Sequence, residues 1–126
     1  MPLTTVTSLK KGSYIMIDNE PCVVKNIDIS KTGKHGASKA RVEAVGIIDG
    51  QKRIIVKPGH ENITVPIIDK RKAQVLSVND LVTVMDLETF ETLSIKADDE
   101  VKEQITEGKT VEYWKIEDKI IIKRLL

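Results

Sequence analysis

Residues 30–39 are the segment of the chain whose residue types could do chemistry. The segment has three lysines and no acidic residue, and it reads Ser30-Lys31-Thr32-Gly33-Lys34-His35-Gly36-Ala37-Ser38-Lys39. Gly33 and Gly36 permit the positive φ angles of a sharp turn, and neither places a side chain beside Lys34. The sequence therefore predicts a long hairpin loop that exposes the Lys34 ammonium on its apolar stem.

A lysine at an exposed loop tip favours two kinds of chemistry. The ammonium can reach into a polyanionic site and contact phosphates as a point charge, or the amine can accept an enzymatic modification. We expect Lys31, Lys39 and Arg41 to add RNA contacts, because affinity for a polyanion comes largely from neutralised phosphates. His35 could stack on RNA or assist a modifying enzyme. A solvated loop without a function fits the same local composition.

Three other kinds of site do not fit the sequence. A Walker-type phosphate loop lies between a strand and a helix, whereas Gly33-Lys34 is followed by His35-Gly36 and more strand. An enzyme that uses Lys34 as a Schiff-base lysine needs a desolvated pocket, which an open loop tip does not offer. Histidines, cysteines and carboxylates show no metal-ligand spacing. We therefore predict no catalytic residue, no metal and no cofactor, and a protein that is not an enzyme.

Alternating and apolar runs on both sides of the loop predict the strands that hold it. In the first half we expect strands at 14–17, 22–29, 41–48, 53–56 and 63–68. Asp18-Asn19-Glu20-Pro21 joins the first two, and Asp49-Gly50 between apolar runs is a strong hairpin signal. Five or six strands with almost no helix indicate an SH3-like barrel.

The second half predicts a different small barrel. Strands are expected at 74–77, 81–87, 91–95, 111–116 and 120–125. The acids at 98–100, followed by Val101, Ile105 and Gly108, make residues 98–108 the one helix candidate. Five strands with one short helix before the last pair are typical of an OB-fold barrel. Alternation should bury at least one of Tyr113 and Trp114, which could otherwise stack on bases.

Charge and residue type suggest where the two barrels meet. Residues 1–69 carry ten basic and seven acidic residues, whereas residues 70–126 carry ten basic and twelve acidic ones. The basic triplet Lys70-Arg71-Lys72 interrupts two apolar strands, so it predicts a short junction there. We therefore expect an all-β protein with an SH3-like domain at 1–69, which carries the loop 30–39, and an OB-fold domain at 70–126.

Composition bounds the class and the compartment. The chain of 126 residues is 40% hydrophobic and 31% charged with a net charge of +1, which is typical of a folded soluble protein. Its single cysteine, Cys22, cannot form an intramolecular disulfide, and the amino terminus lacks a secretory pattern. No apolar run approaches the roughly 18 residues that span a bilayer. We therefore expect a cytoplasmic protein with no membrane partner.

Several motifs resemble one known family. The segment 30–36 followed by Lys39 is similar to the signature loop of the hypusine-containing translation factor family, initiation or elongation factor 5A. The resemblance covers nearly the whole chain, because similar motifs recur at Leu9-Lys10-Lys11-Gly12-Ser13-Tyr14-Ile15, Pro21-Cys22-Val23, Val65-Pro66-Ile67-Ile68-Asp69-Lys70, Gln74-Val75 and Met85-Asp86-Leu87-Glu88-Thr89-Phe90-Glu91. Ala37, in place of a second histidine, and the short amino terminus resemble archaeal members.

The resemblance implies a role for the loop. Lys34 would be the residue to which deoxyhypusine synthase adds an aminobutyl group from spermidine, giving deoxyhypusine and in some organisms hypusine. Ribosome-bound members direct the modified arm at the acceptor end of peptidyl-tRNA, where it promotes peptide-bond formation at stalling sequences such as proline runs. Thr32, Gly33, His35 and Gly36 would belong to the same contacting loop as Lys31, Lys39 and Arg41. The alternative is a general single-stranded RNA-binding protein, which the acidic second half disfavours.

Overall fold

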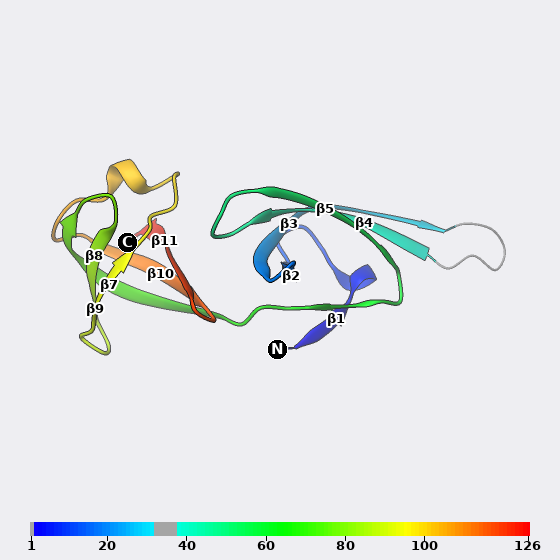
Figure 1. Cartoon of the computed structure of the whole chain (residues 1–126), viewed down its shortest axis with the longest axis horizontal. Helices are drawn as coiled ribbons and strands as arrows, with labels where there is room; N and C mark the ends of the chain where they lie inside the picture. The colour runs from blue at the N-terminus through cyan, green and yellow to red at the C-terminus, as the bar shows by residue number, and fades with distance from the viewer. Residues whose placement is uncertain (1, 32–37) are drawn as a thin grey trace. The chain divides into compact units, whose positions relative to one another are not determined.

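The computed structural model describes residues 2–31 and 38–126 and divides into two compact units, residues 1–67 and 68–126 (Figure 1). Strands make up most of both units, and the described helices are two three-residue 3-10 turns, η1 (Val6–Ser8) and η2 (Lys102–Gln104). The fold is the predicted all-β class, an SH3-like barrel followed by an OB-fold barrel. No helix in the described residues is long and apolar enough to cross a membrane.

The first unit contains six strands. They are β1 (Leu3–Thr5), β2 (Tyr14–Ile17), β3 (Glu20–Lys31), β4 (Ser38–Gly46), β5 (Lys52–Pro58) and β6 (Asn62–Thr64). The strands β2, β3, β4 and β5 form an antiparallel sheet in that order, and β1 pairs with β6. Asp18 and Asn19 have φ angles of 49° and 68°, so both central residues of the β2–β3 turn adopt the left-handed conformation of a tight hairpin.

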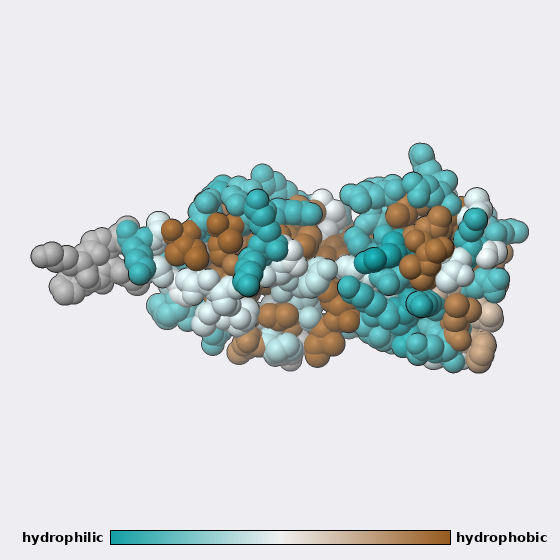
Figure 2. Space-filling model, turned by 180° about the vertical axis from the view of Figure 1, so that it is seen from behind, coloured by the Kyte–Doolittle hydropathy of each residue, from teal (hydrophilic) through white to brown (hydrophobic). Residues whose placement is uncertain are grey.

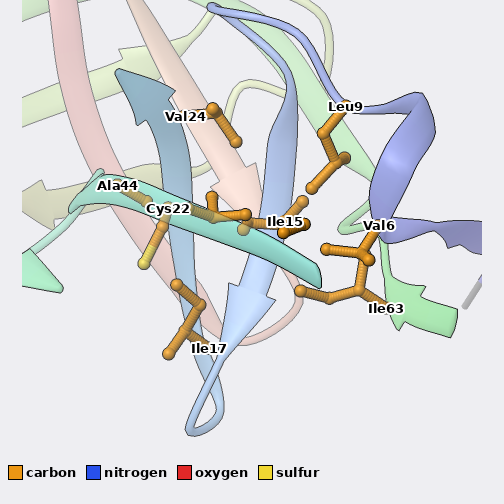
Figure 3. Close-up of a cluster of buried hydrophobic side chains, with 10 residues drawn as sticks. Val6, Leu9, Ile15, Ile17, Cys22, Val24, Ala44 and Ile63 are labelled. Atoms are coloured by element: carbon orange, nitrogen blue, oxygen red, sulfur yellow. The ribbon is translucent and has the colours of Figure 1, made fainter. Parts of the chain in front are cut away.

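One apolar cluster holds the first unit together (Figure 3). Alternate residues of β2, β3 and β4 point into it, and η1 and β6 add one residue each; its buried members are Val6, Leu9, Ile15, Ile17, Cys22, Val24, Ala40, Val42, Ala44 and Ile63. Cys22 is fully buried and fills the core as a small apolar residue, and burial raises the pKa of its thiol. The loop strands β3 and β4 are therefore anchored in this core at their inner ends.

The last strand predicted for this unit is divided in the structure. The predicted strand at 63–68 is two segments, because β6 ends at Thr64 and the next strand begins at Ile68. Pro66 lies between them and has no N–H to donate to a ladder. The short strand β1 had no signal in the sequence, since three residues with two threonines show no clear alternation.

The second unit is a five-stranded barrel. Its strands are β7 (Ile68–Val78), β8 (Val82–Asp86), β9 (Thr92–Ile95), β10 (Thr110–Ile116) and β11 (Lys119–Leu125), in the sheet order β11-β10-β7-β8-β9. A parallel bridge between Ala97 and Ile122 brings the two edges together, with the Ile122 N–H donating to the Lys96 carbonyl at 2.9 Å. This closure and the strand order are those of an OB fold.

The basic triplet at 70–72 is not a junction. Lys70, Arg71 and Lys72 lie inside β7 and pair with Trp114, Tyr113 and Glu112 of β10. The charges are tolerated because Lys70 and Lys72 are exposed and Arg71 binds a buried carboxylate. The boundary predicted after residue 69 therefore falls within a strand.

The predicted helix at 98–108 is reduced to one 3-10 turn. Its start is held by an Asx turn, in which the Glu100 N–H donates to the Asp98 carboxylate at 3.0 Å. Its end returns to the barrel, because the Gly108 N–H donates to the Val75 carbonyl at 2.9 Å. Gly108 has a φ of 85°, which suits its reversal of the chain. The two attachments leave room for η2 but not for further helical turns.

Candidate functional site

The strands β3 and β4 extend further toward Lys34 than the sequence predicted. Ser30 pairs with Lys39 and Lys31 with Ser38, so these four residues of the predicted loop are strand. We call these two pairs the stem. Lys34 and its predicted neighbours Thr32, Gly33, His35 and Gly36 lie outside the described residues.

The stem divides the predicted cations between its two faces. Paired residues of an antiparallel ladder share a face, and successive residues alternate. Lys39 and Arg41 therefore lie on the outer face, whereas Lys31 lies on the same face as Ser38 and Ala40. Lys31, Lys39 and Arg41 are all exposed. An RNA bound along one face would therefore meet Lys39 and Arg41 together, but not Lys31.

The outer face mixes cations with apolar side chains of β5. Val56 and Pro58 pair with Arg41 and Lys39, and Val56 is 59% exposed. Arg41 also donates from Nη1 to Glu43 Oε1 at 2.8 Å, which partly offsets its charge. Figure 2 shows hydrophobic residues interrupting the hydrophilic surface of both units. The face near the stem therefore offers positive charge and apolar contact side by side.

The sequence did not reveal the turn at residues 58–61 as part of the site. The Gly59 N–H donates to the Ser38 carbonyl at 2.7 Å, which joins this turn to the stem. The turn is closed by the Glu61 N–H, which donates to the Pro58 carbonyl at 3.0 Å, and Val6 N–H donates to the Glu61 carbonyl at 3.0 Å. A Pro-Gly pair signals a turn, but nothing in the sequence connects it with Ser38.

The second unit contains a buried polar network. Asp86 is 1% exposed, and its carboxylate accepts hydrogen bonds from Arg71 Nε at 2.6 Å and from the Tyr113 hydroxyl. The backbone N–H groups of Glu88 and Thr89 donate to it at 2.8 and 3.0 Å. Hydrogen bonding to the Arg71 guanidinium holds the pKa of Asp86 well below its ordinary value. Since the carboxylate is fully used by the protein itself, we assign the network a structural role.

A hollow of about 340 Å³ lies over this network, with walls that include Arg71, Asp86, Tyr113 and Lys115. Within its lining, Asp86 accepts hydrogen bonds from Arg71 and Tyr113. In the part of the chain that the structure describes, no group of three His, Cys, Asp or Glu side chains is placed to hold a metal ion. The hollow thus has no arrangement that points to a particular ligand.

Both aromatic residues that could have stacked on bases are buried. Tyr113 is 2% and Trp114 is 6% exposed, so the predicted burial of at least one of them is confirmed. A bulge in the β10–β11 ladder lies at Glu112/Tyr113. The ammonium groups of Lys70 and Lys123 lie 4.7 and 5.4 Å from the Trp114 ring centroid. Neither ring is thus presented as the stacking platform that a single-strand binder uses.

Tyr113 should give the second unit a distinctive alkaline transition. Burial and the hydrogen bond to Asp86 raise the pKa of Tyr113 to about 12, whereas a free tyrosine titrates near about pH 10. Between about pH 10 and 12 the unfolded chain therefore loses a proton that the folded unit keeps, and stability falls as pH rises, by up to roughly 1.4 kcal/mol per unit.

Urea unfolding followed by the fluorescence of Trp114, the single tryptophan, measures this effect. We expect the stability difference between wild type and Tyr113→Phe to shrink by about 2 kcal/mol from about pH 10 to 12. Parallel pH profiles for the two proteins would refute the assignment.

Comparisons with known proteins relate this architecture to translation factors. Residues 2–60 match the family model of the translation initiation factor 5A-like N-terminal domain. The chain is 52% identical over 125 residues to translation initiation factor 5A of Thermococcus kodakarensis, covering 95% of this chain and 92% of the relative. It is 50% identical over 125 residues to the factor of the same name from Pyrococcus horikoshii, covering 95% and 91%.

Solved structures extend the likeness to both units. The chain is similar to eukaryotic translation initiation factor 5A from Methanococcus jannaschii with a TM-score of 0.91 and 42% identity, over 99% of this chain and 94% of that one. It is also similar to a translation initiation factor 5A family protein from Naegleria fowleri, with a TM-score of 0.79 and 28% identity, over 98% and 96%.

Proposed function

Because this chain belongs to the translation initiation factor 5A family, we propose that it binds the ribosome and acts there through a modified Lys34. Its role is in protein synthesis, and its relatives are named as initiation factors, which are not enzymes. The observation that carries the proposal is the likeness to these archaeal factors over 95% of the chain.

In this proposal deoxyhypusine synthase transfers the aminobutyl group of spermidine to the Lys34 amine: a C–N bond of spermidine breaks, 1,3-diaminopropane leaves, and a C–N bond to the Lys34 nitrogen forms. The product is a longer arm with a second amine, which can be charged along its length and can reach further into a narrow RNA-lined site. Lys39 and Arg41 contact RNA phosphates on the outer face of the stem, and Lys31 does so on the other. Thr32, Gly33, His35 and Gly36 complete the contacting loop.

The arm promotes peptide-bond formation by positioning. It holds the acceptor end of peptidyl-tRNA in a productive pose when the nascent chain stalls, as in proline runs. Aligning two reactants in this way can remove several kcal/mol from a barrier without any group that transfers protons or electrons. The protein therefore needs no catalytic residue, metal or cofactor, and we propose that it is a cytoplasmic, non-enzymatic factor.

A reconstituted translation reaction on a proline-run template tests the proposal. The chain treated with deoxyhypusine synthase and spermidine should accelerate peptide-bond formation by roughly ten- to a hundredfold, a small part of what alignment can contribute. The untreated chain at the same concentration is the control and should accelerate it far less. Equal rates with both proteins would overturn the role of the modification, and no acceleration by either would overturn the role on the ribosome.

A further inference from the structure

The stem extends beyond the core of the first unit. Ala40 is fully buried, but its partner Ile29 is 49% exposed, and the next two pairs, which form the stem, are the last that the structure describes before Lys34. Lys39 still pairs with Pro58 of β5, so the hairpin is a two-stranded ribbon only at the Lys31–Ser38 pair. Such a ribbon without a hydrophobic face beneath it is marginally stable in water. The stem therefore needs a contact from outside the hairpin if its end is to be held in one place.

The turn at residues 58–61 provides that contact. Its Gly59 N–H donates to the Ser38 carbonyl at 2.7 Å, and its Gly59 carbonyl accepts from Thr7 Oγ1 at 3.2 Å. Gly59 thus uses both of its backbone groups to connect the last described residue of the stem with η1. Thr7 belongs to η1, whose neighbouring residue Val6 lies in the core. The link therefore runs from the core to the end of the stem.

Only a glycine allows this approach. A Cβ at residue 59 would lie 1.9 Å from Ser38 Oγ, 3.1 Å from Ser38 Cβ and 2.9 Å from Thr7 Cγ2. All three distances are shorter than ordinary van der Waals contact. Neither Ser38 Cβ nor Thr7 Cγ2 is at the end of a long flexible side chain that could move away easily. An alanine would have to push Ser38, Thr7 or the turn itself away. Gly59 is also buried, so a methyl group there would have no open space to occupy.

We propose that Gly59 is a positioning residue, which holds Ser38 against η1 and so fixes the place from which the Lys34 loop leaves the barrel. The function of this link rests on the proposed modification and ribosomal role of Lys34. A fixed point of departure matters because a modifying enzyme and a ribosomal site must both find the same lysine amine. Loss of pre-organisation lowers the rate of a bound reaction even where the reacting group is unchanged.

The substitution Gly59→Ala tests the proposal at two levels. Amide hydrogen exchange should become about tenfold faster at Lys31, Ser38 and Lys39, since a lost backbone hydrogen bond changes local opening by about that factor. With deoxyhypusine synthase, kcat/KM for the variant should fall about tenfold while the Lys34 amine itself is untouched. Unchanged exchange or an unchanged kcat/KM in a folded Gly59→Ala protein would overturn the proposal.

Gly46→Ala is the matched control. Gly46 is the last residue of β4, the strand that begins with Ser38. A Cβ at Gly46 would lie 1.9 Å from Asp49 Oδ1, so the overlap is similar but lies at the opposite end of β4. Even if Gly46→Ala destabilises the unit, amide hydrogen exchange in the stem and kcat/KM should stay within about twofold of wild type. An equal loss in both variants would show that Gly59 acts only through the stability of the unit.

Two further variants complete the test. Ser38→Gly removes the nearest clashing atoms, so the double variant Gly59→Ala/Ser38→Gly should recover most of the lost kcat/KM, and failure to recover would contradict the geometry. Thr7→Val removes the hydroxyl that donates to the Gly59 carbonyl without adding bulk, and it should raise stem exchange about threefold if Gly59→Ala does not fold. Unchanged exchange in Thr7→Val would also overturn the link.

Failure of the proposed function would give a different result from failure of the Gly59 proposal. If wild-type protein is not modified by the synthase at all, Lys34 is not the acceptor. The exchange measurements on the stem would still decide whether Gly59 holds it.

Discussion

Replacing Lys34 with arginine is expected to abolish the acceleration of peptide-bond formation on proline runs and leave both barrels folded. Arginine keeps the positive charge but has no ε-amino group to receive the aminobutyl group. Because Lys34 is expected to be exposed, its replacement should change the free energy of unfolding by less than about 0.5 kcal/mol. Intact mass, urea unfolding and the reconstituted translation reaction measure the three expected results.

The stem supplies controls for this variant. Lys31→Arg and Lys39→Arg make the same substitution in the two strands of the stem, on either side of Lys34 in the sequence. The structure shows both residues to be exposed. Each should keep the modification at Lys34 and most of the activity, because the charge remains in place. Full activity in Lys34→Arg would contradict the modification hypothesis. An equal loss in all three variants would mean that lysine geometry across the loop, rather than one modified amine, is required.

The second large effect is expected in the second unit, where Asp86→Ala should lower stability by about 3 kcal/mol. The substitution leaves Arg71 Nε and the Tyr113 hydroxyl without the carboxylate to which both donate. It also removes the acceptor for the N–H groups of Glu88 and Thr89 that shape the β8–β9 turn. Such losses are large because buried polar groups are left unpaired.

Fluorescence of Trp114 during urea unfolding measures this prediction, since the single tryptophan lies in the second unit. Asp69→Ala is the control, because Asp69 also pairs with Arg71, at 3.2 Å, but its side chain is 53% exposed. That exposed pair should be worth less than about 1 kcal/mol. An Asp86→Ala protein as stable as wild type would show that the network does not hold the barrel together.

Acid should weaken the same network. The folded pKa of Asp86 is depressed, mainly by hydrogen bonding to Arg71. The stabilisation is therefore fully present above the unfolded value of about 3.9 and is lost as pH falls below it. The loss with falling pH should be smaller in the Asp86→Ala variant, because this group no longer titrates there and other carboxylates with a lowered pKa, such as Asp98, still do.

The sequence predicted the local features of the fold well. The tight turn at Asp18 and Asn19 and the Gly50 turn with its φ of 69° follow from residue types that favour these conformations. The alternation from Arg41 predicted a strand there, and in the structure its buried face is formed by Ala40, Val42 and Ala44. Each of these features depends on neighbours within a few residues.

The features that the sequence did not predict depend on distant partners. Arg71 is a strand residue rather than part of a junction because Asp86 lies opposite it. The helix predicted at 98–108 is cut short because Gly108 bonds to Val75 of β7. Gly59 joins the site through Ser38 and Thr7, which are 21 and 52 positions away in the chain. Periodicity and turn residues carry no information about such pairings.

The sequence predicted only part of the candidate site, because the rest also depends on distant partners. Its lysines and glycines were evident from composition, but their distribution over two faces of the stem follows from the register of β3 and β4. That register sets Lys39 beside Arg41 and apart from Lys31. The flanking glycines singled out Lys34 as an exposed tip, and the resemblance of the motifs pointed to its modification.

The most direct test of the central claim is peptide mass spectrometry of the protein isolated from the cells that make it. We expect an aminobutyl or hydroxylated aminobutyl group on Lys34 and unmodified lysines at residues 31 and 39. An unmodified Lys34 in the native protein would contradict the proposed mechanism, and the same group on another lysine would contradict the assignment of the arm.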